Sequence, residues 1–202
     1  MEITIPSRKQ QIIETAAGMF REKGYAASSM RDLASLLGIE AASIYHHVKS
    51  KEEILETICF DLADQLVHAI AEVNDIYFNA EERLRLAIKN HITIITHNIN
   101  RSGVFLHEWR SLTEPKLSEF KTLRAAYENE LRLIIADGIK EDAFDDVDEK
   151  FATLTILSTV NWVTEWFNKD GKMNAEQVAD KLCDFILGGL RKKLITDINY
   201  KP

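Results

Sequence analysis

The sequence contains little cysteine, proline or glycine: 2 Cys, 3 Pro and 8 Gly among 202 residues. Cys59 and Cys183 lie far apart and form no CxxC pair, so neither a zinc site nor a disulfide framework is indicated, and we expect two buried thiols. The scarcity of Pro and Gly, with abundant Leu, Ile, Ala, Glu and Lys, favours a mostly helical protein.

Long apolar runs are also absent. No stretch approaches the roughly 18 uninterrupted apolar residues of a membrane span, and the first residues, MEITIPSRKQ, lack the basic and apolar regions of a signal peptide. We therefore expect a globular cytoplasmic protein without a membrane partner. Its 46% hydrophobic residues are enough to fill a core.

The motifs of common enzymes and metal sites are missing as well. The chain has no P-loop, GxSxG, HExxH or dinucleotide-binding glycine pattern. His91 and His97 point to different sides of a helix, so we expect core or surface histidines and no metal. The acidic segment EDAFDDVDEK lacks the glycine and spacing of an EF-hand and is expected to cap the next helix. The sequence thus predicts no catalytic residue and no cofactor.

Charge is distributed unevenly along the chain, whose net charge is −7. Residues 1–51 carry seven Lys or Arg against five Asp or Glu, whereas residues 52–202 carry eighteen against twenty-seven. Only the N-terminal part is therefore suited to a polyanion, although solvated helix faces often reach the same mild balance.

Apolar periodicity predicts an all-α fold of about nine helices. They span about 7–23, 30–37, 40–46, 50–73, 80–100, 103–111, 115–140, 148–168 and 175–194. No repeat or flexible linker separates them. We expect a three-helix domain over 1–51, continuing into the linking helix 50–73, and a helical domain over 52–202.

The second and third predicted helices form a helix-turn-helix. Ala34 is small enough for the two helices to approach, Gly38 permits the turn, and Ile44 packs back between them. Ser29, with Asp32 three residues later, is a plausible cap for the first of the two. In such a motif the second helix enters the major groove of DNA.

The segment SIYHHVKSKEEIL, residues 43–55, gathers cationic and hydrogen-bonding groups at this motif. Tyr45, His46 and Lys51 are placed where a phenol, an imidazole and an ammonium group can bind phosphates. Ser29 can present its hydroxyl and a helix N-terminus to another phosphate. The alternative is that these are ordinary surface or packing residues.

The segment SSMRDLASLLGIEAASIYHHVKSKEEIL resembles the DNA-binding segment of TetR-family transcriptional regulators. The resemblance implies phosphate contacts from Ser29, Tyr45, His47 and Lys51. It also places Ala41, Ala42 and Ser43 at the start of the recognition helix, and Val48 where the family prefers phenylalanine. Two alanines offer only methyl groups, so we expect sparse direct base recognition, with thymine methyl contacts possible.

Aromatic residues mark two segments of the C-terminal part. GVFLHEWRSL places Phe105 and Trp109 one helical turn apart, and LSTVNWVTEWF does the same for Trp162 and Trp166. Such stripes are typical of core packing. Tryptophan beside polar groups such as Asn161 also fits the wall of a ligand pocket, so both interpretations stay open.

Three segments, FLHEWRSL, RAAYENELRLIIADGIKEDAF and NWVTEWFNKDG, are similar to the ligand-binding domain of a TetR subgroup that includes acyl-CoA-responsive repressors of fatty-acid, phenylacetate and sterol-ring catabolism. The similarity implies a small apolar effector, best an acyl-CoA thioester, with free fatty acids or other apolar effectors as alternatives. The candidate ligand-binding residues are Phe105, Trp109, Arg110, Arg124, Tyr127, Asn161, Trp162 and Trp166. Arg110, Lys121 and Arg124 are the nearest cations for CoA phosphates. Phe167, where tyrosine is common, and NKDG, where proline usually precedes the glycine, depart from the subgroup pattern.

The last two helices are expected to form a homodimer as a four-helix bundle. The apolar positions that favour it are Phe151, Leu154, Leu157, Val160, Val178, Leu182, Phe185, Ile186 and Leu190. Packing within one subunit is the alternative. These features together predict a repressor that binds operator DNA and is released when a ligand shifts the helix that begins at Ser50. A helical interaction protein that never binds DNA is the remaining hypothesis.

Overall fold

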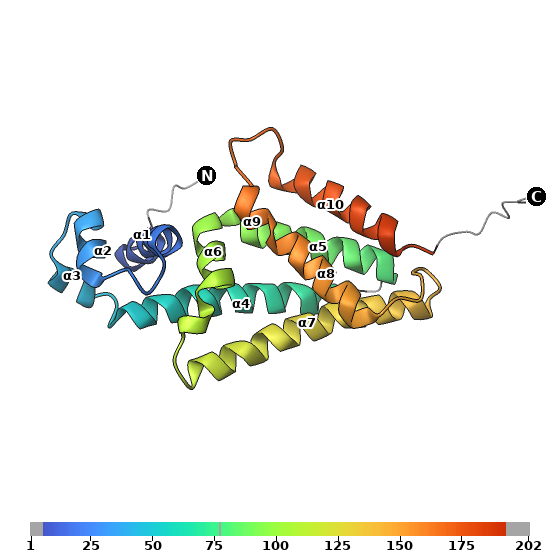
Figure 1. Cartoon of the computed structure of the whole chain (residues 1–202), viewed down its shortest axis with the longest axis horizontal. Helices are drawn as coiled ribbons and strands as arrows, with labels where there is room; N and C mark the ends of the chain where they lie inside the picture. Colours follow the sequence, from blue (N-terminus) through green and yellow to red (C-terminus); the bar gives the residue numbers. More distant parts are fainter. Residues whose placement is uncertain (1–5, 77, 193–202) are drawn as a thin grey trace, which may run out of the picture.

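A computed structural model describes residues 6–76 and 78–192, and these residues form ten α-helices and one 3-10 helix (Figure 1). Apart from one isolated bridge between Phe144 and Arg191, they contain no β-structure. The elements are α1 (Arg8–Lys23), α2 (Met30–Leu37), α3 (Ala41–Tyr45), α4 (Lys51–Asp75), α5 (Ala80–His97), α6 (Ile99–His107), η1 (Trp109–Ser111), α7 (Lys116–Lys140), α8 (Glu149–Asn161), α9 (Val163–Trp166) and α10 (Ala175–Leu190). The predicted all-α fold is confirmed.

The helices form a small N-terminal unit joined by one long helix to a larger bundle (Figure 1). α1, α2 and α3 lie at one end, and α4 runs from them into the body of the molecule beside α7. α6 packs between α1 and α4, while α5 packs against α4, α7, α8 and α10. The N-terminal unit is therefore connected to the bundle both through α4 and through the contact of α1 with α6.

Side-chain caps fix the ends of the first and fourth helices. The Ser7 hydroxyl accepts from the Gln10 backbone N–H at 3.2 Å, and the Ser50 hydroxyl accepts from that of Glu53 at 3.0 Å. Each satisfies an amide that has no partner within its own helix. Gly24 follows α1 with φ +82°, a conformation that side chains disfavour. The starts predicted at Ser7 and Ser50 are confirmed.

Two hydrophobic cores meet along α4. One contains the buried residues of α1 and α2, Ile44, Val48, the α4 segment 54–66 and Phe120 of α7. The other contains Ile70 and Val73 with α5, the second half of α7, α8, α9 and α10. α4 thus contributes to both cores, and the domain boundary expected between residues 51 and 52 stays a prediction.

Three of the predicted helices have clearly different limits, and the helix expected at 103–111 is α6 at Ile99–His107 followed by η1. The expected helix 80–100 ends at His97 because the Asn98 side chain accepts from the Arg101 backbone N–H at 3.1 Å and starts α6. The expected helix 148–168 divides at Trp162 into α8 and α9, where the Thr164 hydroxyl donates to the Asn161 carbonyl at 2.9 Å. Such a side-chain bond competes with the helical ladder.

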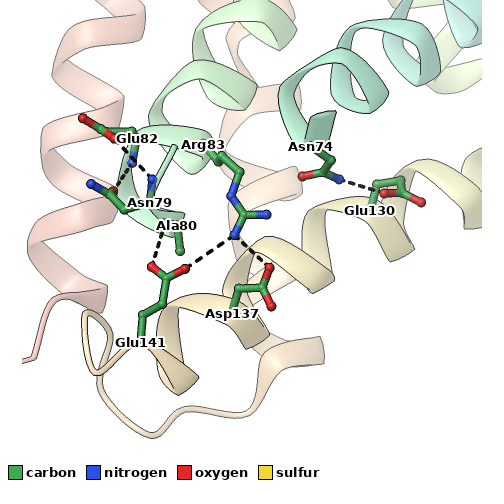
Figure 2. A network of polar contacts seen from close by, with 8 residues as sticks. All are labelled: Asn74, Asn79, Ala80, Glu82, Arg83, Glu130, Asp137 and Glu141. Carbon is green, nitrogen blue, oxygen red and sulfur yellow. Dashed lines mark hydrogen bonds and ion pairs between the residues drawn. The ribbon is translucent and has the colours of Figure 1, made fainter. Parts of the chain in front are cut away.

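The α4–α5 turn is held onto α7 by a polar network (Figure 2). Arg83, whose side chain is only 12% exposed, donates to Asp137 at 2.8 Å and lies 3.7 Å from Glu141. Glu141 also accepts from the first backbone N–H of α5, at Ala80, at 2.9 Å. A carboxylate at a helix N-terminus is favourable, so this network fixes where α5 begins relative to α7.

Part of the apolar residues predicted for a dimer interface on the last two helices pack within the chain, which was the alternative. Val160, Val178, Ile186 and Leu190 are buried in the core of the chain itself, and Leu157 and Leu182 pack against that core. The dimer itself stays a prediction. Phe151, Leu154 and Phe185 are exposed.

No helix of the described residues is long and apolar enough to cross a membrane. Cys59 and Cys183 are both buried and free, as predicted.

Candidate functional site

The helix-turn-helix consists of α2 and α3 joined by a left-handed turn. Ser29 and Asp32 form a capping box: the Asp32 backbone N–H donates to the Ser29 hydroxyl at 3.1 Å, and the Ser29 backbone N–H donates to the Asp32 carboxylate at 3.0 Å. Hydrogen bonds from Ser29 lower the pKa of Asp32. Gly38 adopts φ +63°, and the fully buried Ile44 secures α3. The predicted cap, turn and packing residue are confirmed.

One face of α3 and the following turn points to solvent. Ala42, Ser43, His46 and His47 are exposed, and Tyr45 is 53% exposed although it is a large aromatic residue. Ala41 is half-buried and packs against the first core. The exposed face is short, since α3 has five residues, and it carries hydroxyl and imidazole groups that can donate to phosphates.

Lys51 is held by the loop between α1 and α2. Its ammonium group donates to the carbonyls of Tyr25 and Ser28 at 2.9 and 2.8 Å and lies 4.2 Å from the centre of the Tyr25 ring. An ammonium group has three donors, so two are used by the protein. Lys51 therefore ties α4 to this loop, a structural role that the sequence alone did not indicate.

Sequence reasoning also passed over two cations near this face. Arg31 and Lys49 are exposed, and neither side chain forms an ion pair within the described part of the chain. Arg31 follows the predicted phosphate ligand Ser29 by two positions, and Lys49 lies between the predicted ligands His47 and Lys51. This closeness in sequence is the signal that indicates the two cations.

A cavity lies in the bundle between α4, α5, α6, α7 and α8. It encloses about 490 Å³ of space, part of it open to solvent. Its lining consists of Ala63, Leu66, Val67, His91, Phe105, Leu106, Leu123, Arg124, Tyr127, Glu128, Leu157 and Asn161. The wall is mainly aliphatic and aromatic with a few polar groups, which is the usual composition of a small-molecule site.

His91 of α5 lines this cavity and forms hydrogen bonds to one residue of α7 and one of α8. Its Nδ1 lies 2.8 Å from the Tyr127 hydroxyl and its Nε2 lies 3.0 Å from the Asn161 side-chain oxygen. Burial lowers the pKa of His91 to about 4 and raises that of Tyr127, so both are neutral at pH 7. The Tyr127 hydroxyl then donates to Nδ1, and Nε2–H donates to Asn161.

Arg124 lines the same cavity and lies among aromatic rings. Its guanidinium carbon lies 5.1 Å from the ring centre of Trp109 and 6.0 Å from that of Phe105. Arg110 lies over the same Trp109 ring at 4.4 Å. Burial, followed by the nearby Arg110, lowers the pKa of Arg124. Two cations therefore lie beside one indole ring.

The structure brings together half of the predicted ligand-binding residues. Phe105, Arg124, Tyr127 and Asn161 line the cavity, and Trp162 lines an adjoining hollow. Trp109, Arg110 and Trp166 line neither space. Trp109 lies in the 3-10 helix η1 beyond the end of α6, where its ring packs against Phe120 at 5.8 Å between centroids. Trp166 is an exposed residue of α9, and Lys121 is also exposed.

His91 is the cavity residue that sequence reasoning missed. It lies between Ala87, Ile88, Ile92 and Ile95 on the apolar face of α5, and that position was the available signal. His97 is exposed, so the two histidines are a core and a surface residue as expected. In the part of the chain that the structure describes, no group of three or more metal-ligating side chains is close enough to hold an ion.

An apolar groove lies between α8 and α10. It is open to solvent and is lined by Val147, Phe151, Ala152, Thr155, Ile156, Thr159, Phe185, Ile186, Gly189 and Leu190. Phe151 and Phe185 are 71% and 79% exposed, which is high for phenylalanine in a folded protein.

Comparison with known proteins agrees with this arrangement. Residues 12–58 match the family model "Bacterial regulatory proteins, tetR family", and residues 78–190 match "Tetracyclin repressor-like, C-terminal domain". The chain is 29% identical to the transcriptional repressor KstR2 of Mycobacterium tuberculosis, covering 94% of this chain and 96% of that protein. It is 25% identical to the fatty acid metabolism regulator protein of Bacillus subtilis, covering 91% and 95%.

Two solved structures have the same fold. The ketosteroid transcriptional regulator KstR2 of Mycobacterium tuberculosis is 28% identical, with a TM-score of 0.88 over 94% of this chain and 97% of that one. AibR, solved in complex with isovaleryl coenzyme A and operator DNA, is 28% identical, with a TM-score of 0.76 over 89% and 97%. Because the C-terminal model alone spans more than half of the sequence, the chain belongs to the tetR family of bacterial regulatory proteins.

Proposed function

We propose that this protein is a transcriptional repressor that binds an operator through α2 and α3 and is released from it by an acyl-CoA thioester. The observation that carries the proposal is the position of the cavity. Ala63, Leu66 and Val67 of α4 form part of its wall, and the same helix begins at Ser50, directly after the helix-turn-helix. A ligand in the cavity therefore contacts the helix that positions the DNA-binding unit.

The proposed DNA-binding face is the exposed surface of α3. Tyr45, His46 and His47 bind phosphates together with the remaining N–H of Lys51, while Ala41, Ala42 and Ser43 face the base edges. Ser29, whose hydroxyl donates to Asp32 at 2.6 Å, contributes by placing the N-terminus of α2 at a phosphate. Support comes from their common exposure, with Ala41 half-buried beside them, and from the capping box that leaves the N-terminus of α2 at the surface. DNA is in the cytoplasm of a bacterium, which is where we place the protein.

A homodimer supplies the second recognition helix. We place its interface at the groove between α8 and α10, because Phe151 and Phe185 line it and are largely exposed. Leu154 is a further exposed apolar residue of α8. Two recognition helices about 34–36 Å apart can then enter successive turns of the major groove.

The effector is proposed from the cavity and from the relatives. Its aliphatic wall suits an acyl chain, the Bacillus relative is a fatty acid metabolism regulator, and the AibR structure contains isovaleryl coenzyme A. Ligand binding shifts the equilibrium between two arrangements only by its difference in affinity for them. A hydrophobic effector without CoA is the alternative, and an enzymatic role is disfavoured because the relatives are regulators.

The test is an operator-release assay. Purified protein is titrated onto a labelled fragment from upstream of its own gene in the presence of excess unrelated DNA, then onto the same fragment with a panel of acyl-CoA thioesters, their free acids, or CoA alone. Specific binding that one thioester class weakens and CoA does not supports the proposal. Specific binding that every member of the panel leaves unchanged refutes the effector, and failure to prefer the fragment over unrelated DNA refutes the operator.

A further inference from the structure

A side chain of α1 reaches across α6 to α9. The Arg21 guanidinium donates through Nη2 to the Thr164 carbonyl at 2.9 Å and through Nη1 to the Asn100 side-chain oxygen at 3.3 Å. α6 lies between α1 and α9 (Figure 1), and the stem of Arg21 passes over it at Gly103. A Cβ at Gly103 would lie 3.1 Å from the Arg21 Cδ and crowd it. The missing side chain at this glycine therefore gives Arg21 its route to Thr164.

The Thr164 carbonyl is available because the helix breaks at Trp162. The last helical bond of α9 joins the Phe167 N–H to the Val163 carbonyl at 2.9 Å. Among the described residues, no backbone N–H donates to the next carbonyl, that of Thr164, although Thr164 is buried. A buried carbonyl without a donor is costly, and Arg21 supplies the donor. The break in the helix thus creates the acceptor that α1 uses.

The same threonine is also connected to the cavity. Its hydroxyl donates to the Asn161 carbonyl at 2.9 Å, and the Asn161 side-chain oxygen lies 3.0 Å from His91 Nε2. His91 and Asn161 both line the cavity. A continuous chain of hydrogen bonds therefore runs from the cavity wall through Asn161 and Thr164 to Arg21 of the DNA-binding unit.

The other polar contacts of α1 with α6 do not involve the cavity. Glu14 of α1 accepts from Asn98 and lies 3.9 Å from Arg101 Nη1, and Arg101 also donates to Asp61 of α4 at 2.6 Å. None of these four residues lines the cavity. Within residues 6–76 and 78–192, the Arg21–Thr164 bond is the one hydrogen bond that joins the first three helices to α8 or α9.

We infer that Arg21 couples the state of the cavity to the position of the DNA-binding unit. The inference rests on the proposed function of the cavity as the effector site and names the residue that conveys its state to α1. A change that moves Asn161 acts through Thr164 on the bonds of Arg21, and so on α1. A chain of contacts is a coupling pathway when changes at its two ends have non-additive effects, which a double-mutant cycle measures.

Hydrogen exchange in α1, followed by mass spectrometry, is a measurement that needs neither DNA nor ligand. The cycle consists of the wild type, Asn161→Ala, Arg21→Met and the double variant. Arg21→Met should speed exchange at the C-terminal end of α1 by about fivefold, as expected for one lost hydrogen bond. Asn161→Ala should speed it by at least about twofold in the wild type and leave it unchanged in Arg21→Met. Equal factors in the two backgrounds, or no effect in either, would overturn the inference.

Two further variants separate coupling from a general loss of structure. Lys23→Met removes another exposed cation from the last turn of α1. It should change neither the exchange of α1 nor the effect of Asn161→Ala, and loss of that effect in this background would also overturn the inference. If Asn161→Ala does not fold, Thr164→Val replaces it, because valine has nearly the same shape and removes only the hydroxyl bond to the Asn161 carbonyl.

Operator binding separates this inference from the proposed function. The same four proteins are titrated onto the upstream DNA fragment without any ligand, and Asn161→Ala should change the Kd by at least about twofold in the wild type but not in Arg21→Met. A Kd that changes equally in both backgrounds would overturn the inference. A protein that shows coupling by hydrogen exchange yet does not prefer the fragment keeps the Arg21 link and loses the repressor role. Specific operator binding with additive exchange effects does the reverse.

Discussion

Replacing His91 by glutamine should remove a pH-dependent component of the stability. His91 is 3% exposed, and both ring nitrogens are hydrogen-bonded in the neutral form. Protonation would add a proton at Nδ1, where the ring now accepts from Tyr127, and would put a charge in an apolar site. Glutamine has a similar polar character but does not titrate, so its pH profile lacks this contribution.

The sign follows from the direction of the shift. The pKa of His91 falls from its ordinary value of 6.5 to about 4 in the folded protein, so between these values the unfolded chain binds more protons. Stability therefore rises with pH across this window and is lost as the pH falls. The complete loss is about 3 kcal/mol for this shift at 1.36 kcal/mol per pKa unit, and about 2 kcal/mol of it occurs between pH 7 and pH 5.

Urea unfolding at pH 7, 6 and 5, at one fixed protein concentration, measures this loss. The wild type should lose about 2 kcal/mol more than His91→Gln over the two pH units. At pH 7 the variant should be less stable by about 1–3 kcal/mol, because the buried partners of His91 are left imperfectly paired. His97→Gln, which changes an exposed histidine of the same helix, should follow the wild type. Parallel pH profiles for His91→Gln and the wild type would refute the assignment of a buried neutral histidine.

Four further substitutions examine the DNA contact, the packing and the polar network. Tyr45→Phe should weaken binding to specific and unrelated DNA alike, by about fivefold, because one hydrogen bond is lost. The salt dependence of binding should stay unchanged because the phenol carries no charge. A fluorescence anisotropy titration across a salt series checks both expectations. Gly138→Ala should lower the free energy of unfolding, measured in urea, by about 1–3 kcal/mol, since its Cβ would lie 2.1 Å from the ring of Phe144. Gly188→Ala is the control: it has open space around it and should raise the free energy of unfolding by about 0.5–1 kcal/mol. Arg83→Met should lower the melting temperature only slightly, with a cost of about 0.5–1 kcal/mol, because Asp137 and Glu141 are 46% and 40% exposed and water can replace their partner. An unchanged melting temperature would show that the Arg83 ion pairs in Figure 2 contribute nothing to stability.

Local sequence signals were sufficient where a short-range interaction decides the structure. The caps at Ser7, Ser29 and Ser50 and the left-handed Gly38 depend on contacts within a few residues, and each was identified from the sequence. The helix-turn-helix followed from them. Lys51 was different, because the carbonyls that bind it belong to Tyr25 and Ser28, more than twenty residues earlier.

The cavity was only partly predictable because its lining comes from five helices. The tryptophans drew attention for their size, yet Trp109 packs in the first core and Trp166 is exposed. The sequence predicts only a core or surface role for His91, since a single histidine among aliphatic residues has no sequence partner. Its partners Tyr127 and Asn161 are 36 and 70 positions away, and only the packing of α5 against α7 and α8 brings the three together.

The division of the expected helix 148–168 has the largest consequence for the site. A continuous helix would keep Trp162 and Trp166 on one stripe, as the sequence suggested. The break at Trp162 instead places Trp162, Thr164 and Glu165 around the hollow that adjoins the cavity, and the Thr164 carbonyl accepts from Arg21 of α1 at 2.9 Å. This hollow is thus joined directly to α1 of the DNA-binding unit, a second connection besides the one that α4 makes from the wall of the cavity.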